Sequence, residues 1–302
     1  MKTVLAYLRL TRPANIVTAI ADILAGWWIS ISVENAFSEW IVIPNRFATL
    51  LFLVLATIGL YGGGVVMNDV ADFELDKIER PERAIPSGII SRTSATIFGI
   101  SLLIAGIFCA VIVSTLSGGI ALTIAILALI YNFFGKYSRF FGPINMGMCR
   151  GGNLLLGMSV AFPIIWVWPL SLIPVIYIAA ITMISRGEVI GGNKKAIVFA
   201  GVLYGIVVLA IQYFSIIQTK FLDLIFANAF IALFAVLIFR PLILAFRNPD
   251  PMNIRKAVKS GVISLIAMDA ALATCFSGWV MGLIILALLP ISLLLAKGFA
   301  VT

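Results

Sequence analysis

The residues best suited to chemistry lie in one short acidic stretch, 68–83, which holds six of the chain's 13 carboxylates. Asn68, Asp72 and Asp76 recur at every fourth position. On a helix each such step turns by only about 40°, so the three side chains share one face. Oxygen ligands stacked in this way repel one another unless a cation lies between them, and a set without nitrogen or sulfur suits Mg²⁺. The spacing therefore predicts a magnesium site at a helix end.

A simpler interpretation of this stretch is a solvated helix end. Its acids would then pair with the neighbouring cations Lys77, Arg80 and Arg83. The regular spacing at the edge of an apolar segment favours the metal site over this alternative.

The absence of histidine limits the chemistry further. The chain has no histidine, and its three cysteines, Cys109, Cys149 and Cys275, form no CxxC pair. This removes the commonest general base, an axial haem ligand and any disulfide framework. Catalysis would have to use carboxylates, amides, cations and aromatic rings.

The elements that must position the acidic stretch are membrane-spanning helices. Of 302 residues, 62% are apolar and 11% are charged, and the mean hydropathy is +1.13. Soluble domains carry about 25% charge, so a soluble globular domain is excluded. The apolar residues form blocks of spanning length, which predicts an all-α, polytopic membrane bundle. Hydropathy gives ten apolar segments, and we expect nine, possibly ten, transmembrane helices: 14–33, 47–68, 93–116, 118–135, 144–165, 169–185, 197–217, 221–239, 258–276 and 279–296.

Basic residues mark one face of the predicted bundle. The N-terminus and the connections after the second, fourth, sixth and eighth segments hold 18 of the 21 Lys and Arg residues. Positive charge stays on the cytoplasmic side, so we expect the N-terminus and the working face to be cytoplasmic. The net charge of +8 then reflects membrane topology, and no nucleic-acid partner is needed to explain it.

The acidic stretch reads NDxxDxxxD at 68–76 and continues with Arg80-Pro81, Arg83 and Ile85-Pro86-Ser87-Gly88. This pattern resembles the first Asp-rich motif of the UbiA superfamily of intramembrane prenyltransferases. The opening Arg12-Pro13-x-Asn15 is similar to that family too, as is the layout of Tyr131, Lys136, Asn145, Arg150 and Asn153. The resemblance implies a single transmembrane prenyltransferase domain over residues 1–302. Such an enzyme transfers an isoprenyl group from its diphosphate to an acceptor and requires Mg²⁺.

The second half departs from the family pattern. Members carry a second Asp-rich motif, DxxxD, after the sixth span, where this chain reads SRGEVIGGNKK at 185–195. Glu188 and Asn193 are the only metal-type side-chain oxygens there, and an ordinary basic loop with a glycine turn is the alternative. We expect two four-helix repeats to bring this loop opposite the first motif across a central cavity, with Glu188 as the partner in the metal site.

The resemblance suggests roles for the polar residues near these two stretches. The catalytic candidates are Asp69, Asp72, Asp76 and Lys136, and the metal ligands are Asn68, Asp69, Asp72, Asp76 and Glu188. The diphosphate-binding candidates are Arg83, Lys136, Arg150, Arg186, Asn193 and Lys194. Mg²⁺ and these cations would stabilise the departing diphosphate, and an electron-rich carbon or oxygen would capture the allylic cation. For every cation except Lys136, membrane topology alone explains the position equally well.

Polar side chains inside the spans are expected to face the bundle interior, because charge in hydrocarbon is costly. The candidates for the acceptor pocket or cavity are Asn15, Asp22, Tyr61, Tyr131 and Asn153. Asp22 could be an acceptor-pocket group or a proton acceptor, whereas Asp269 is expected to serve helix packing. For the two tyrosines, an interfacial or packing role is the alternative.

The residues do not fix the acceptor. An aromatic quinone precursor is favoured, and a prenylated glycerol-phosphate lipid comes next. The expected partners are therefore an isoprenyl diphosphate donor, a small aromatic or lipid acceptor, and membrane lipids.

A secondary transporter of an anionic substrate is the alternative function, but it would place its binding groups near the midplane of the membrane. A CDP-alcohol phosphotransferase is disfavoured because its DxxDGxxAR arrangement is absent.

Overall fold

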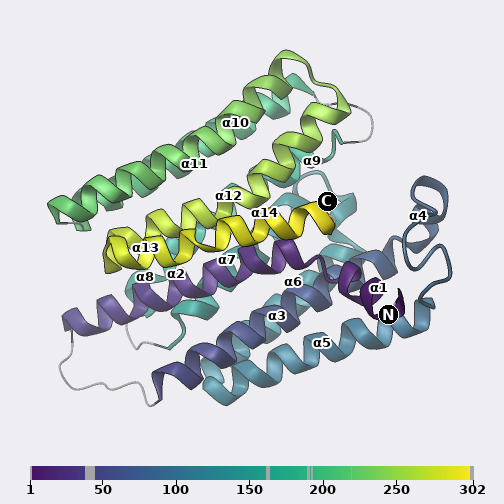
Figure 1. Ribbon diagram of the computed structural model, residues 1–302, viewed down its shortest axis with the longest axis horizontal. Coiled ribbons are helices and arrows are strands. Elements are labelled where there is room, and N and C mark those ends of the chain that lie inside the picture. The colour runs from purple at the N-terminus through teal and green to yellow at the C-terminus, as the bar shows by residue number, and fades with distance from the viewer. Residues whose placement is uncertain are drawn as a thin grey trace.

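The computed structural model describes residues 2–37, 45–160, 164–188, 191, 193–218 and 220–299, and within them every regular element is a helix. The long helices run side by side as a bundle (Figure 1). The expected all-α architecture is confirmed.

The helices follow one another with short connections. The first half contains α1 (Lys2–Leu10), α2 (Pro13–Phe37), α3 (Arg46–Ala71), α4 (Phe73–Glu79), α5 (Arg92–Val113) and α6 (Thr115–Phe133). The second half contains α7 (Phe141–Met158), α8 (Ile164–Val167), α9 (Leu172–Ser185), α10 (Lys194–Gln218), α11 (Phe221–Arg247), α12 (Pro251–Ser277), α13 (Trp279–Leu286) and α14 (Leu288–Gly298). The 3₁₀ turns η1 (Gly135–Tyr137) and η2 (Trp168–Ser171) precede α7 and α9.

Helix α2 lies at the centre of the bundle. Each long helix packs against the next one along the chain, and α12 returns to contact α2, which also contacts α3, α7 and α14. One face of α2, including Ala21 and Ala25, belongs to the apolar core shared with α7 and α9–α12. Another face, including Ile23 and Trp27, belongs to the core shared with α3, α5 and α6. The two halves of the chain therefore meet on α2, while the predicted internal repeat stays a prediction.

Helices α2 and α7 approach each other closely at two glycines. A Cβ atom on Gly26 would lie 2.4 Å from the carbonyl oxygen of Leu154, and one on Gly157 would lie 2.6 Å from that of Ile23. Contacts this short are sterically forbidden, so only glycine permits this approach. It places the polar residues of α7 directly against α2.

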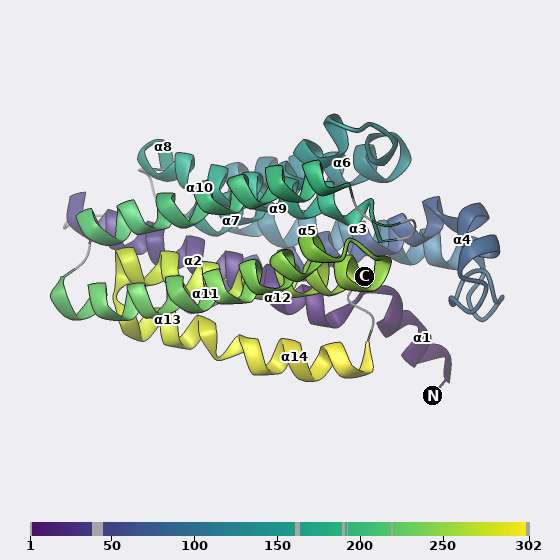
Figure 2. The ribbon, with the colours of Figure 1, turned by 90° about the horizontal axis from the view of Figure 1, so that it is seen from above.

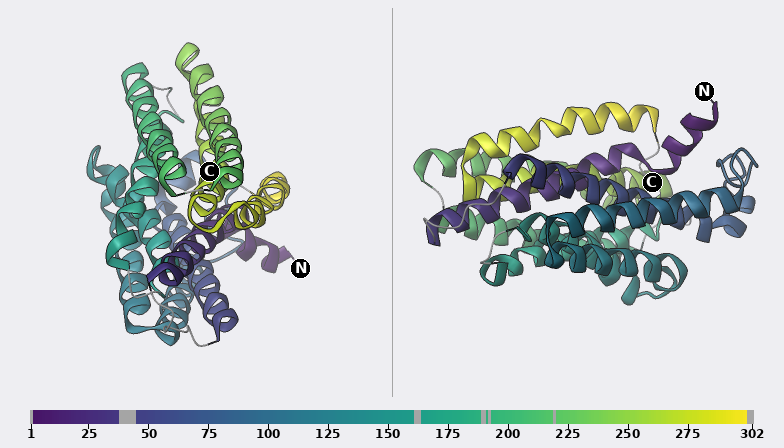
Figure 3. Two further views of the ribbon diagram at one scale, coloured as in Figure 1. Left: turned by 90° about the vertical axis from the view of Figure 1, so that its left-hand side faces the viewer. Right: turned by 90° about the horizontal axis from the view of Figure 1, so that it is seen from below.

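Nine of the described helical segments are long and apolar enough to cross a membrane: 13–33, 46–71, 92–113, 115–133, 168–185, 194–217, 221–247, 251–277 and 279–298. Helix α7 is not among them, yet its 18 residues span about 27 Å at the usual rise. Figures 2 and 3 place α1 and the last residues of α14 toward the end of the bundle that carries α4. Because α2 begins next to α1 and α14 ends on the same side, the described helices make an even number of passes, which favours ten spans over nine.

The boundaries differ most from expectation around residues 240–257. This stretch is predicted as a connection, but α11 continues through Pro241 to Arg247 and α12 begins at Pro251. Proline is well suited to the first turn of a helix, and the Asp250 carboxylate caps α12 by accepting a hydrogen bond from the Asn253 amide at 2.7 Å. The last segment instead breaks between α13 and α14, just before Pro290.

Candidate active site

The acidic stretch occupies the junction between α3 and α4. Helix α3 ends at Ala71, but helical hydrogen bonding continues, because the amide of Asp72 donates to the carbonyl of Asn68 at 2.9 Å and that of Asp76 to Asp72 at 2.8 Å. Asp72 therefore marks a local kink in a nearly continuous helix. This geometry agrees with the predicted four-residue spacing of Asn68, Asp72 and Asp76.

Asp69 and Asp76 both pair with arginines on one flank of this helix. Arg12 lies 3.0 Å from Asp69, and Arg83 lies 3.4 Å from Asp69 and 2.7 Å from Asp76. The guanidinium of Arg83 thus bridges two carboxylates of the motif. Arg12 itself has a positive φ of 49°, a conformation that is uncommon for any residue other than glycine and that is set just before Pro13. We call Arg12, Arg83 and the exposed Arg9 the arginine flank.

The opposite flank is formed by Lys136, which follows α6. Its ammonium donates to the carboxylate of Asp72, and both side chains are largely buried. Arg186, after α9, donates to the carbonyl oxygens of Lys136, at 3.2 Å, and of Ser138. Tyr131 lies within electrostatic range of Arg186 and Asp72. We call Lys136, Arg186 and Tyr131 the lysine flank.

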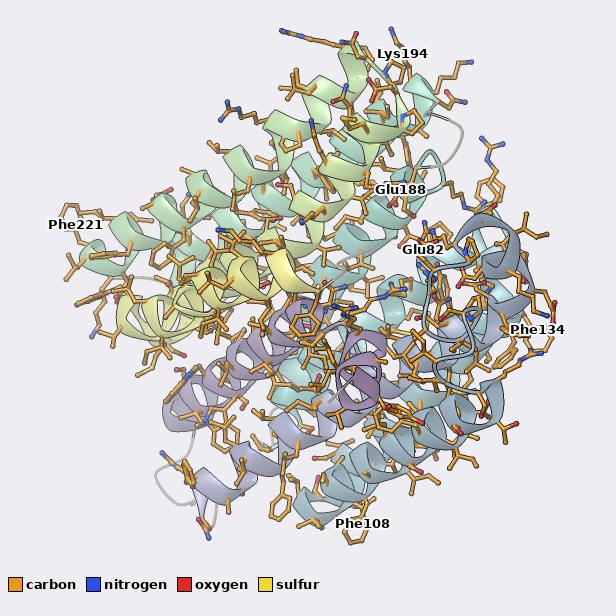
Figure 4. The ribbon with its side chains drawn as sticks, turned by 45° about the vertical axis from the view of Figure 1, so that its right-hand side comes forward. Glu82, Phe108, Phe134, Glu188, Lys194 and Phe221 are labelled. Atoms are coloured by element: carbon orange, nitrogen blue, oxygen red, sulfur yellow. The ribbon has the colours of Figure 1, made fainter. Side chains whose placement is uncertain are left out.

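Glu188 lies near guanidinium groups from both halves of the chain. Its side chain is buried, with 8% of the residue exposed. Burial raises the pKa of the Glu188 carboxyl, although the nearby guanidinium groups of Arg255, Arg80 and Arg12 lower it. Figure 4 shows Glu188 and Glu82 on the same side of the bundle. Glu188 therefore lies on the side of the bundle that carries Glu82, while its partnership with the first motif in a metal site stays a prediction.

Three further candidates lie together in the bundle interior, away from the acidic helix. Arg150 of α7 lies 2.6 Å from Asp22 of α2 and also donates to the carbonyl of Thr18. Asn153 donates to Asp22 at 2.9 Å and accepts from Thr57 at 2.7 Å. The structure thus pairs the predicted phosphate ligand Arg150 with the predicted pocket residue Asp22. Asp269 of α12 is fully buried beside Asp22.

Two remaining pocket candidates lie along the same helices. Asn15 is buried near the start of α2, and the side chain of Tyr61 on α3 lies under the Arg150 guanidinium, 5.9 Å from ring centroid to Cζ. Tyr61 therefore contacts the interior cluster through Arg150.

Asn193 and Lys194 do not join the acidic helix. The Asn193 side chain accepts from the Lys195 amide at 2.9 Å and so caps α10. Lys194 is exposed, and its ammonium lies 5.5 Å from the ring centroid of Phe246 on α11. Figure 4 shows Lys194 at an outer corner of the bundle, away from Glu82 and Glu188. Asn193 therefore caps a helix, and Lys194 lies on the surface of the bundle.

Within the described residues, no group of three or more Asp, Glu or Cys side chains converges as a ready-made metal site. The carboxylates instead pair with cations on the two flanks. Mg²⁺ typically binds through one or two carboxylates together with substrate phosphates and water. An oxygen-only set of Asn68, Asp72 and Asp76 on one helical line fits that mode and does not fit an all-protein cage.

Sequence reasoning missed several cations and one acid at this end. Arg12 was noted only as part of a motif, while Arg9, Glu82 and Arg255 were not singled out as site residues. The sequence could have indicated Arg9 and Arg12 as site residues, because both lie in the basic N-terminal segment. Nothing in the linear order, however, places Arg255 near Glu188.

Comparison with known families decides the affiliation of this fold. Residues 23–256 match the family described as the UbiA prenyltransferase family. The chain belongs to this family. The match includes the acidic helix, the lysine flank and Glu188, so the resemblance seen in the sequence is confirmed.

Relatives within the UbiA family share substantial identity. A digeranylgeranylglyceryl phosphate synthase from Methanococcoides burtonii is 34% identical over 160 residues, which is 53% of this chain and 55% of the relative. A protein of the same name from Sulfurisphaera tokodaii is 28% identical over 245 residues, which is 78% of this chain and 84% of the relative. The chain thus spans little more than half the length of the first of these relatives.

Solved structures share the fold. A structure reported for digeranylgeranylglyceryl phosphate synthase in membranes has a TM-score of 0.65 at 23% identity and covers 92% of this chain and 99% of that one. A UbiA homologue from Archaeoglobus fulgidus bound to GPP and Mg²⁺ has a TM-score of 0.59 at 15% identity and covers 88% and 99% of the two chains. At these identities the likeness concerns the fold, which is an integral-membrane helical bundle.

Proposed function

We propose that this UbiA-family chain, residues 1–302 acting as one domain, transfers an isoprenyl group from its diphosphate to an acceptor at the end of the bundle that carries α4. One observation carries the proposal. The acidic helix 68–76 lies between two cationic flanks, with Lys136 on Asp72 and Arg83 on Asp69 and Asp76. Carboxylates that could share a cation, set between groups that could hold phosphate, suit a diphosphate leaving group.

Mg²⁺ is the expected cofactor. The Archaeoglobus fulgidus homologue bound to GPP and Mg²⁺ supports it, as does the oxygen-only donor set. Asn68, Asp72 and Asp76 would hold the ion, with Asp69 beside them and Glu188 facing them from the second half. When bound, Mg²⁺ would neutralise the charge that develops on the departing diphosphate.

The protein's own side chains would orient and retain that diphosphate. Lys136, which now neutralises Asp72, can turn toward a phosphate oxygen when a cation takes over the carboxylate. Arg186 is held by backbone carbonyls next to Lys136 and offers further donors. Arg83, the other predicted diphosphate ligand at this end, instead pairs with Asp69 and Asp76 on the arginine flank.

The group transfer breaks one bond and forms another. The C1–oxygen bond of the isoprenyl diphosphate breaks and diphosphate leaves with the electron pair. An oxygen of the acceptor hydroxyl bonds to C1, and its proton passes to the departing diphosphate. The apolar interior of the bundle would exclude water, which would otherwise capture the allylic cation.

We propose a prenylated glycerol-phosphate lipid as the acceptor. Relatives named digeranylgeranylglyceryl phosphate synthase support it, and their name denotes a product with a glyceryl phosphate and two geranylgeranyl groups. The aromatic acceptor favoured by the sequence analysis has no such support. We further propose that the reaction takes place on the cytoplasmic side and that the N-terminus is cytoplasmic, since the basic connections gather at this end.

The test uses purified protein in detergent with Mg²⁺, geranylgeranyl diphosphate and either a monoprenylated glyceryl phosphate or an aromatic quinone precursor. We expect diphosphate release and a diprenylated lipid with the first acceptor only. Asp72→Asn and Asp76→Asn should each lower the rate by about 10²-fold or more, since each weakens charge stabilisation in the transition state. Circular dichroism in the same detergent checks that the variants are folded. Diphosphate release with the aromatic acceptor alone would contradict the lipid assignment, and no release with either would favour a transporter.

A further inference from the structure

A cavity of about 240 Å³ adjoins the acidic helix on the arginine flank. It lies between α1, the connection that follows α4, and the last residues of α14. Its polar walls are formed by Arg9, Arg12, Asp69, Glu82 and Arg83, and Gly298 closes it on the side of α14. Segments from both ends of the chain therefore enclose one space beside the motif.

Two of the three arginines around this cavity form ion pairs, and the third, Arg9, forms none among the described residues. Asp69 accepts from both Arg12 and Arg83, and Arg83 also reaches Asp76. Arg9 also lines the cavity, is exposed, and has no ion pair among the described residues. Three guanidinium groups thus face one space in which the acids are Asp69 and Glu82. An anion that enters would meet one free guanidinium and two more that are held in place by Asp69.

The backbone holds one of these cations in an unusual conformation. Arg12 occupies the left-handed region between α1 and α2, and its amide donates to the carbonyl of Arg9 at 3.2 Å. This tight turn brings Arg9 and Arg12 to the same cavity. Strained backbone of this kind persists where the surroundings fix it and is frequent at ligand sites.

The rest of the lining is apolar and comes from Ala6, Leu10, Ala84 and Ile89. A ligand with a phosphate and an adjoining lipid portion would match both parts. The donor diphosphate, in contrast, is assigned to the lysine flank on the other side of the acidic helix. Because Arg83 touches Asp76, a group bound in the cavity lies next to the motif.

We propose that this cavity binds the phosphate of the lipid acceptor, with Arg9 as its principal ligand and Arg12 and Arg83 as supporting donors. The proposal rests on the proposed function for the identity of the acceptor, but the binding site can be tested without turnover. Guanidinium groups bind phosphate oxygens through paired hydrogen bonds, which suits a phosphate monoester. The cavity would then select acceptors that carry a phosphate.

The experiment measures equilibrium binding of a monogeranylgeranylated glyceryl phosphate, and of the same lipid without its phosphate, to the purified full chain. For the wild-type chain we expect tighter binding of the phosphorylated lipid. Arg9→Gln should weaken binding of that lipid about tenfold, the effect of losing a charge-assisted hydrogen bond, and move the affinity for the dephosphorylated lipid less than twofold. Arg247→Gln, which removes an exposed arginine at the end of α11, is the matched control and should change neither affinity.

Four other outcomes are informative. Equal binding of both lipids to the wild-type chain overturns the inference, and so does an Arg9→Gln chain that binds as tightly as wild type. A matching loss of affinity for geranylgeranyl diphosphate in Arg9→Gln also overturns it, because Arg9 would then belong to the donor site. Phosphate-dependent binding that is lost in Arg9→Gln, together with no transfer by the wild-type chain, supports the cavity assignment and refutes the proposed function. Arg9 is exposed, so the variant should fold, and a melting curve of each variant checks this.

Discussion

Arg150 on α7 places its Nε atom 2.6 Å from Oδ2 of Asp22 on α2, and both residues are almost fully buried. Asn153, one turn further along α7, donates to the same carboxylate. This buried cluster, together with the contact of Gly26 and Gly157, joins the two helices at which the halves of the chain meet. We therefore expect this ion pair to stabilise the packing of α7 against α2.

Removing the cation from this pair should destabilise the protein. Arg150→Met leaves the Asp22 carboxylate buried without its guanidinium, and breaking a buried pair in this way costs about 3–5 kcal/mol. The double variant Asp22→Asn with Arg150→Met should recover part of that loss, because no uncompensated charge of the pair remains. Detergent-denaturation curves measure both. Arg247→Met on the surface is the control. An Arg150→Met chain of wild-type stability that loses donor affinity would instead support the phosphate-binding role predicted from the sequence.

The close approach of α2 and α7 leads to a second prediction, which concerns the stability of the protein. Gly26→Ala puts a methyl group 2.4 Å from the Leu154 carbonyl oxygen, so the helices must separate, and overpacking of this kind costs about 1–3 kcal/mol. Gly205→Ala on α10 is the matched control, because a Cβ atom there meets nothing within 4 Å. Thermal unfolding in detergent should show a lower midpoint for the first variant and an equal or higher midpoint for the second. Equal midpoints for Gly26→Ala and wild type would show that α7 moves away from α2 at little cost.

Much of this architecture could be predicted from the sequence, because a membrane makes apolar length and basic loops informative. The four-residue spacing of Asn68, Asp72 and Asp76 also predicted their helical geometry, since it depends only on local structure. Lys136 was placed near the motif through a family resemblance, and the structure pairs it with Asp72.

The remaining site depends on contacts between distant segments, which no local pattern specifies. Arg150 is predicted to bind phosphate with the cations of the loops, yet its helix turns it inward to Asp22, 128 positions away along the chain. Lys194 follows the loop that contains Glu188, but α10 begins there and directs it to Phe246. Arg12 is predicted only as part of a motif, whereas the structure gives it a left-handed backbone, pairs it with Asp69 and places it in the lining of the cavity.

The pairing of Lys136 with Asp72 yields a prediction for donor binding. Lys136→Met removes the cation that we assign to the diphosphate, so the KM for the isoprenyl diphosphate should rise about tenfold or more. Lys136→Arg should retain part of the affinity, because a guanidinium also binds phosphate. Steady-state kinetics with the acceptor at saturation separate this effect from acceptor binding. Lys256→Met, an exposed lysine on α12, is the control. If Lys136→Met changed only the acceptor KM, the roles of the two flanks would have to be exchanged.

The orientation of the bundle gives a further test, because both faces offer an exposed position. Ser87 lies in the connection after α4, at the end that holds the acidic helix, and Lys220 lies between α10 and α11 at the opposite end. In a cysteine-free background, we would introduce Ser87→Cys or Lys220→Cys and treat intact cells with a membrane-impermeant maleimide. Since basic connections stay in the cytoplasm, position 220 should react in intact cells and position 87 only after permeabilisation. The reverse pattern would place the acidic helix outside the cell and would contradict the cytoplasmic assignment of the reaction, while leaving the geometry of the two flanks unchanged.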